Sequence, residues 1–290
     1  MFVLAVTINL GGIALSALLG AIGGGAGALI GGIIDRSRGG KPGLFTGICA
    51  AIGVVLALNI GKPASPDPDL GRDASIEDVR AAVMSSPEFG KPLRTLEARN
   101  PRAAAAFIQW FYDTHQQVLA DGVPRDEILQ TIAARSGAII DRRMTRLPDD
   151  RLQIGFDLRL DMFRRLIAAD TRVCGGTLPL FITALSPEVQ RIVADMTPEF
   201  YDLVFGTDLV DGLPMLDDAT FMEKSGQLVD IIAPDHPEGM AALTGAQSLT
   251  RDNAATYCAL ELDLFEQIAL LPPSERMTYY RTMLKASSSP

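Results

Sequence analysis

Two long uncharged stretches dominate the hydropathy pattern of the first 60 residues. Residues 1–34 contain no charged side chain, and residues 44–60 form a second uncharged run of 17 residues. A helix needs about 20 mainly apolar residues to cross a bilayer, so the first run is long enough and the second is just long enough. The pattern predicts a transmembrane helical hairpin over residues 1–61, with spans at about 10–34 and 44–60.

Small residues recur at every fourth position of the first span. One set, Gly23, Gly27 and Gly31, forms a GxxxGxxxG pattern. A second set lies on an adjacent side of the same predicted helix and comprises Gly12, Ser16, Gly20, Gly24, Ala28 and Gly32. The second span offers a matching row of Gly43, Gly47 and Ala51. Because residues four apart share a helix face, these small side chains let two membrane helices approach closely.

This glycine pattern resembles the glycine-zipper hairpins of two-transmembrane membrane proteins, some of which form oligomers or pores. The resemblance covers residues 1–61 and identifies a class of motif. It is compatible with three arrangements: the small faces pack the two helices of one hairpin together, they join neighbouring subunits, or they surround a conducting pore. A water-filled pore needs polar lining residues, and the hairpin supplies only Thr7, Asn9, Ser16, Thr46 and Asn59.

Three basic residues set the predicted topology. The turn between the spans, residues 35–43, contains Arg36, Arg38 and Lys41 against a single acid, Asp35. Short basic loops stay in the cytoplasm, so both ends of the hairpin are predicted to face outward. We therefore expect a two-pass protein of a bacterial-type inner membrane, with its C-terminal domain in the periplasm. A cleaved signal peptide is disfavoured, because the amino terminus lacks Lys and Arg and the apolar run is about twice too long.

Beyond residue 61 the pattern becomes that of a helical extramembrane domain. Residues 62–74 include three prolines within six positions, which predicts a semi-rigid linker. Several capping residues then precede proline, as at Asn100, Ser186 and Thr197, and each such pair is typical of a helix start.

Apolar residues at helical spacing, such as Phe156, Leu160, Phe163 and Ile167, predict amphipathic helices, and no β alternation of useful length is found. The fold class is therefore all-α, with the helical domain over residues 75–286 and a disordered tail at 287–290. The expected helices are 75–85, 92–99, 101–121, 124–146, 149–170, 187–195, 198–206, 217–233, 250–271 and 273–286.

Composition narrows the classes of partner. The net charge of −9 argues against nucleic acid. With 48% hydrophobic and only 21% charged residues, long disorder driven by charge is excluded. Arginine is nevertheless concentrated between residues 135 and 172, and a candidate basic interaction face comprises Arg142, Arg143, Arg146, Arg164 and Arg165. Such a face suits anionic lipid headgroups or an acidic partner, whereas the interleaved acids favour the alternative of ion pairs on a solvated helix surface.

Little in the sequence points to catalysis. His115 has the spacing of a buried helix residue, and His236 lies in an expected loop between Asp235 and Glu238. We found no GxSxG, HExxH or P-loop motif, and we expect no catalytic residue, metal or cofactor.

The three cysteines leave two alternatives open. Cys174 and Cys258 either pair in an oxidising compartment or remain separate buried thiols, whereas Cys49 lies in the second predicted span. The opposite topology would place the helical domain in the cytoplasm, with reduced cysteines.

These observations favour a membrane-anchored assembly or adaptor protein. It self-associates through its glycine faces, as a homo-oligomer or a subunit of a membrane-protein complex, and presents a helical domain to protein partners. The alternatives are a pore-forming oligomer and a membrane-tethered envelope enzyme.

Overall fold

A computed structural model describes residues 74–85, 90–123, 139–169, 187–243 and 254–287. The predicted hairpin, its glycine faces, the basic turn and nearly all of the linker lie outside these residues. In the part described, every regular element is a helix and no strand is present, which confirms the all-α prediction for that part. None of the described helices combines the length and the apolar character needed to span a bilayer.

The described residues form nine α-helices with assigned labels and one 3-10 turn. In chain order they are α3 (Ile76–Ser85), α4 (Gly90–Arg99), α5 (Pro101–Ala120), α7 (Asp149–Ala169), α8 (Pro187–Gly206), α9 (Asp218–Ile232), the 3-10 turn η4 (Ala233–Asp235), α10 (Pro237–Leu243), α11 (Ala254–Leu270) and α12 (Pro273–Ser287). Residues 139–144 are also helical and lead through a turn into α7.

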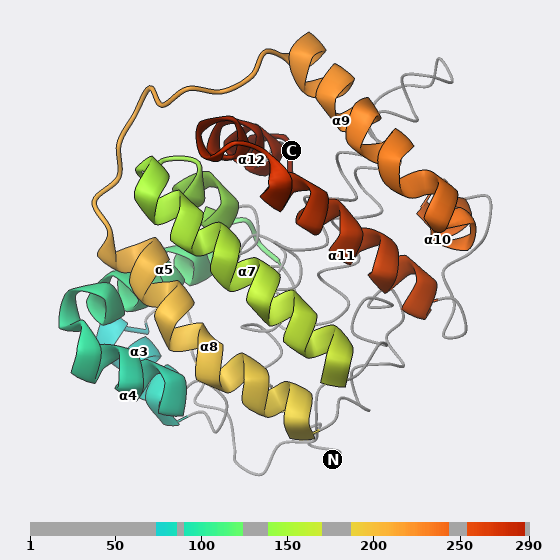
Figure 1. The fold of residues 1–290 in the computed structure, drawn as a ribbon. Coiled ribbons are helices and arrows are strands. Elements are labelled where there is room, and N and C mark those ends of the chain that lie inside the picture. Colours follow the sequence, from blue (N-terminus) through green and yellow to red (C-terminus); the bar gives the residue numbers. More distant parts are fainter. Residues whose placement is uncertain (1–73, 86–89, 124–138, 170–186, 244–253, 288–290) are drawn as a thin grey trace.

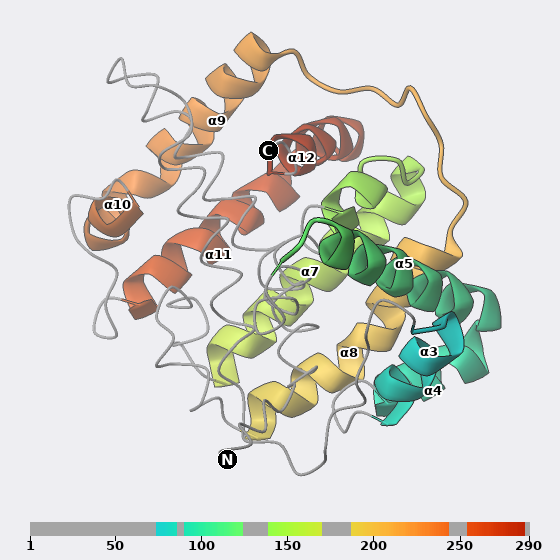
Figure 2. The same cartoon turned by 180° about the vertical axis from the view of Figure 1, so that it is seen from behind.

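Four helices form the centre of the fold. Figure 1 shows α8, α7, α11 and α9 side by side, and each packs against the next in that order. The helices α3, α4 and α5 gather on the other side of α8, as the reverse view in Figure 2 also shows. The α12 helix packs against α7 and α11. The connection from α8 to α9, residues 207–217, runs along the edge of the molecule (Figure 1).

Local sequence signals explain several helix starts. The side chain of Asn100 accepts a hydrogen bond from Ala103 N at 3.1 Å, and Pro101 occupies the first position of α5. Asp217 accepts from Thr220 N at 2.9 Å at the start of α9. These side chains satisfy backbone donors that the first helical turn leaves unpaired.

The structure corrects the predicted break at Thr197-Pro198. Instead of two helices, α8 continues from Pro187 to Gly206 with Pro198 inside it. An internal proline costs roughly 3 kcal/mol. Apolar residues on both sides of it, including Val189 and Val204, are fully buried, and α8 packs against α4, α5 and α7. This burial outweighs the local preference of proline to begin a helix.

A second difference lies at residues 233–243, part of which was expected to be a loop. The chain forms η4 and then α10, with Pro237 at the first position of α10. Gly239 brings this segment close to α11, because a Cβ atom there would lie 2.9 Å from Thr256 O and 3.1 Å from Leu260 Cβ. The segment is too short to show helical periodicity in its sequence.

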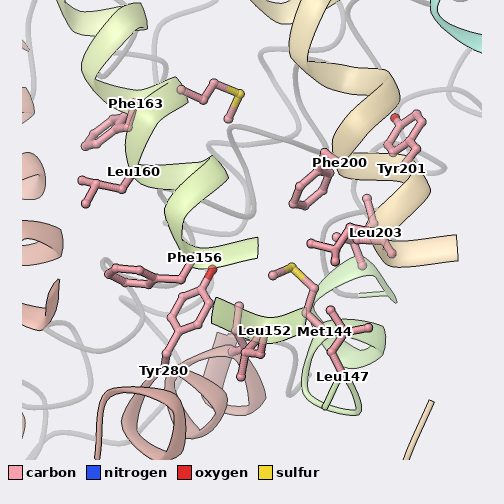
Figure 3. Close-up of a cluster of buried hydrophobic side chains, with 14 of the residues drawn as sticks. Met144, Leu147, Leu152, Phe156, Leu160, Phe163, Phe200, Tyr201, Leu203 and Tyr280 are labelled. Carbon is pink, nitrogen blue, oxygen red and sulfur yellow. The ribbon is translucent and has the colours of Figure 1, made fainter. Parts of the chain in front are cut away.

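The core lies where α7, α8 and α12 meet. Figure 3 shows Phe156, Leu160 and Phe163 on α7 and Phe200 and Leu203 on α8, with further apolar side chains between the helices. All five of these side chains are buried. The predicted spacing of apolar residues on α7 thus corresponds to its buried face.

Candidate functional site

A buried ion pair lies in the core between α7 and the helical segment 139–144. Arg159 donates to Asp141 Oδ1 at 2.8 Å and to Tyr280 Oη at 2.9 Å, and its guanidinium lies 5.4 Å from the ring centre of Phe200. Burial opposes the charge of Arg159, but Tyr280 and Asp141 outweigh it, so the pKa of Arg159 is raised. Burial also raises the pKa of Tyr280 to about 12. Both groups keep their usual protonation at neutral pH, and the cluster connects four segments of the chain.

Arg281 on α12 has a similar connecting role. It is fully buried and donates to Thr145 O and Leu147 O at 3.0 Å each, to Asp149 Oδ1 at 2.7 Å and to Pro214 O at 3.4 Å. These bonds satisfy carbonyl groups in the turn before α7 and in the α8–α9 connection. Neither buried arginine faces a space that a substrate could enter, because both side chains have no exposed surface.

The two histidines lie in different surroundings. His115 is buried within α5, as its spacing predicts. His236 Nε2 lies 2.6 Å from Asp263 Oδ2 on α11, whereas its sequence neighbours Asp235 and Glu238 are exposed. The structure thus pairs His236 with a residue that sequence reasoning did not single out. In the described residues, no group of three or more His, Cys, Asp or Glu side chains could hold a metal ion.

The five arginines of the predicted basic face fall into two groups. Arg164 pairs with Glu266 at 2.9 Å and Arg165 pairs with Asp161 at 2.7 Å, both on the exposed surface. These two lie toward the end of α7, about 22 Å along the helix from its start. Arg142, Arg143 and Arg146 precede α7, in the turn and the short helix before it.

The second group contains one arginine in an unusual position. Arg146 pairs with Asp211 at 2.8 Å, whereas Arg143 has no carboxylate partner among the described residues. Arg143 Nε donates to Val204 O at 3.1 Å, and its guanidinium carbon lies 4.9 Å from the ring centre of Phe205. Burial, reinforced by the charge of Arg146, lowers the pKa of Arg143. The guanidinium is therefore fixed along one edge, and no carboxylate in the described part of the chain neutralises its charge.

Carboxylates without basic partners are concentrated beyond α8. Residues 207–243 contain eight Asp and Glu residues and a single Lys. Asp208 and Asp211 pair with Arg102 and Arg146, and Lys224 pairs with Glu275 on α12. Within the described part, six exposed carboxylates have no Lys or Arg partner, namely Asp217, Asp218, Glu223, Asp230, Asp235 and Glu238. We call these six the acidic surface.

Cys258 is buried in α11 and is disulfide-bonded. The other two cysteines of the chain, Cys49 and Cys174, both lie outside the described residues. Of the two alternatives at Cys258, the structure thus supports a disulfide over a free thiol.

Comparison of the chain with protein-family models, with curated proteins and with solved structures finds no match.

Proposed function

We propose that this chain is a membrane-anchored assembly or adaptor protein. Its amino-terminal hairpin self-associates through the glycine faces, and its helical domain is presented to protein partners. The observation that carries the proposal is the contrast between the buried and exposed charges of the domain. The buried arginines Arg159 and Arg281 hold helices together, whereas the carboxylates of the acidic surface have no Lys or Arg partner among the described residues.

An acidic surface of this kind suits a protein partner of opposite charge. Complementary charges steer two proteins together and select the correct partner. Ile231 is 55% exposed and lies next to Asp230 on α9, which adds an apolar contact to the same surface. A basic partner with an apolar side chain would remove the mutual repulsion of the carboxylates.

The disulfide at Cys258 supports a location of the domain in an oxidising compartment. Disulfides persist in the periplasm and are rare in the cytoplasm, where thiols are kept reduced. This agrees with the topology that Arg36, Arg38 and Lys41 predict, with the basic turn inside and the domain outside.

The test is the native mass of the full chain in mild detergent, compared between variants. Gly27→Leu places a large side chain in the GxxxGxxxG face and is expected to reduce an oligomer to the monomer. Gly25→Leu makes the same chemical change on neither of the two predicted faces and serves as the matched control. An oligomer that survives Gly27→Leu, or a monomeric wild-type chain, would contradict self-association through this face.

The His236–Asp263 pair favours a second candidate, the membrane-tethered envelope enzyme. A carboxylate that holds an imidazole in one orientation is a common arrangement for a general base. This candidate predicts turnover of envelope material that His236→Gln abolishes, while the helical content stays unchanged. Equal activity of wild type and variant, or no activity in either, would exclude it.

A further inference from the structure

The short helix before α7, residues 139–144, presents an arginine that is held in place and that no carboxylate of the described residues neutralises. Arg143 Nε is bonded to Val204 O near the end of α8, and the guanidinium stacks on Phe205. Among the described residues, its two terminal nitrogens have no hydrogen-bond partner, and they are not buried. The free edge of a guanidinium presents two parallel donors, which match two oxygens of a phosphate group.

The surroundings of Arg143 add charge and apolar surface. Arg146 lies one helical turn away, and its carbonyl accepts a hydrogen bond from Val210 N at 2.8 Å. The Val210 side chain, on the residue bonded to Arg146, is 43% exposed. Asp211 pairs with Arg146, whereas no carboxylate of the described residues pairs with Arg143. An arginine next to an exposed apolar side chain suits the boundary between lipid headgroups and acyl chains.

The predicted tether keeps this surface near a bilayer. The linker between residues 61 and 74 reaches at most about 50 Å when fully extended. The acidic surface belongs to residues 217–238, whereas Arg143 belongs to the helical segment 139–144, so the two surfaces lie on different elements. Docking through Arg143 therefore leaves the acidic surface free for a protein partner.

We propose that Arg143, flanked by Arg146 and Val210, binds the phosphate of an anionic lipid headgroup and so docks the helical domain on the membrane that anchors it. This inference rests on the proposed membrane anchorage.

The chain contains its own reporter for this contact. Trp110 is the only tryptophan, and its ring centre lies 5.5 Å from that of Phe205, the ring on which Arg143 stacks. The full chain is reconstituted into vesicles of phosphatidylcholine alone or mixed with phosphatidylglycerol, each with a trace of lipid carrying a nitroxide on its headgroup. Quenching of Trp110 fluorescence then measures the ratio of docked to undocked domain.

Quenching is expected to rise with the fraction of phosphatidylglycerol, and Arg143→Gln is expected to lower the docked ratio about fivefold. Arg165→Gln removes the same charge from an exposed pair on α7 and is expected to match wild type. Arg143→Lys retains the charge but lacks the two parallel donors, so its docked ratio is expected to lie between those of wild type and Arg143→Gln. This second variant also guards against a folding defect in Arg143→Gln. Wild-type docking in Arg143→Gln or Arg143→Lys, or an equal loss in Arg165→Gln, would overturn the proposal.

Two further measurements distinguish lipid phosphate from free phosphate, and the docking proposal from the membrane anchorage on which it rests. In detergent without vesicles, inorganic phosphate is expected to leave the melting temperature unchanged relative to chloride at equal ionic strength. A stabilisation that Arg143→Gln removes would assign the site to free phosphate and overturn the lipid proposal. Flotation with vesicles after alkaline washing tests the anchor itself. If the chain floats with the vesicles but the domain does not dock, only the docking proposal is wrong. If the chain does not float, both membrane anchorage and docking are wrong.

Discussion

The half of the domain around α7 and the region of α9 and α10 use charge in opposite ways. Around α7, Arg159 and Arg281 lie in the interior and each bonds to several segments. On α9 and α10, the carboxylates of the acidic surface are exposed and lack basic partners in the part of the chain that the structure describes. Net charge alone therefore does not locate a functional surface. A charge that stabilises the fold is buried and paired, and a charge available to a partner is exposed and unmatched.

The largest expected effect comes from breaking the buried pair. Asp141→Ala leaves Arg159 charged in the core without its carboxylate, which is expected to cost about 3–5 kcal/mol of the free energy of unfolding. Chemical denaturation of the full chain in detergent, followed by circular dichroism, measures the loss.

The matched control for Asp141 is Asp161→Ala, which breaks the exposed pair with Arg165 on the same helix. Its cost is expected to stay within about 1 kcal/mol. Similar losses in the two variants would contradict the distinction between buried and exposed charge.

The second largest effect concerns the disulfide that joins α11 to the rest of the chain. Cys258→Ser is expected to cost about 2–4 kcal/mol, because the unfolded chain regains the freedom that the crosslink removes. Labelling of denatured wild-type protein by a maleimide, without reductant, should modify one cysteine of the three. Labelling of all three would contradict the disulfide, and Cys174→Ser and Cys49→Ser identify the partner, because only the partner's variant frees Cys258.

Helix positions could be read from the sequence far better than the contacts of the candidate site. Asn100 and the apolar spacing on α7 are local signals, and the helices they predict begin and end within a residue or two of the observed bounds. Pro198 misled the prediction, because a local signal for a helix start was outweighed by burial on both sides. Local patterns report backbone preference, and tertiary packing decides where the two compete.

The contacts of Arg159 and Arg143 had no local signal in the sequence. Arg159 and Tyr280 are 121 residues apart in the chain, and Arg143 and Val204 are 61 apart. Arg143 and Arg165 look alike in sequence, since both belong to one arginine-rich segment with interleaved acids. The spacing of Asp161 and Arg165, four residues apart, already allows an ion pair on one helix, whereas only the fold shows that Arg143 has no carboxylate partner in the described part.

Two glycines of the α9–α10 region differ in their surroundings, since Gly239 is closely packed and Gly226 has open space beside it. Gly239→Ala is expected to destabilise the domain by about 1–3 kcal/mol, because the new Cβ would lie 2.9 Å from the backbone oxygen of Thr256. Gly226→Ala, in the middle of α9, meets nothing within 4 Å and is expected to stabilise by about 0.5–1 kcal/mol. Thermal unfolding compares the two, and a loss at Gly226 equal to that at Gly239 would show that another group covers the outer side of α9.

The smallest expected effect is a pH dependence at the start of α9, where an exposed carboxylate does act on the fold. Hydrogen bonds from Thr220 lower the pKa of Asp217 below its ordinary value near 3.8. A lowered pKa contributes stability that is present above the ordinary value and is lost as the pH falls through the folded value. The melting temperature of Asp217→Ala is therefore expected to lie below that of wild type at pH 7, and the difference should shrink in acid. A difference that stays constant from neutral to acidic pH would mean that the charge of Asp217 contributes nothing to the cap, and that its carboxylate serves only the acidic surface.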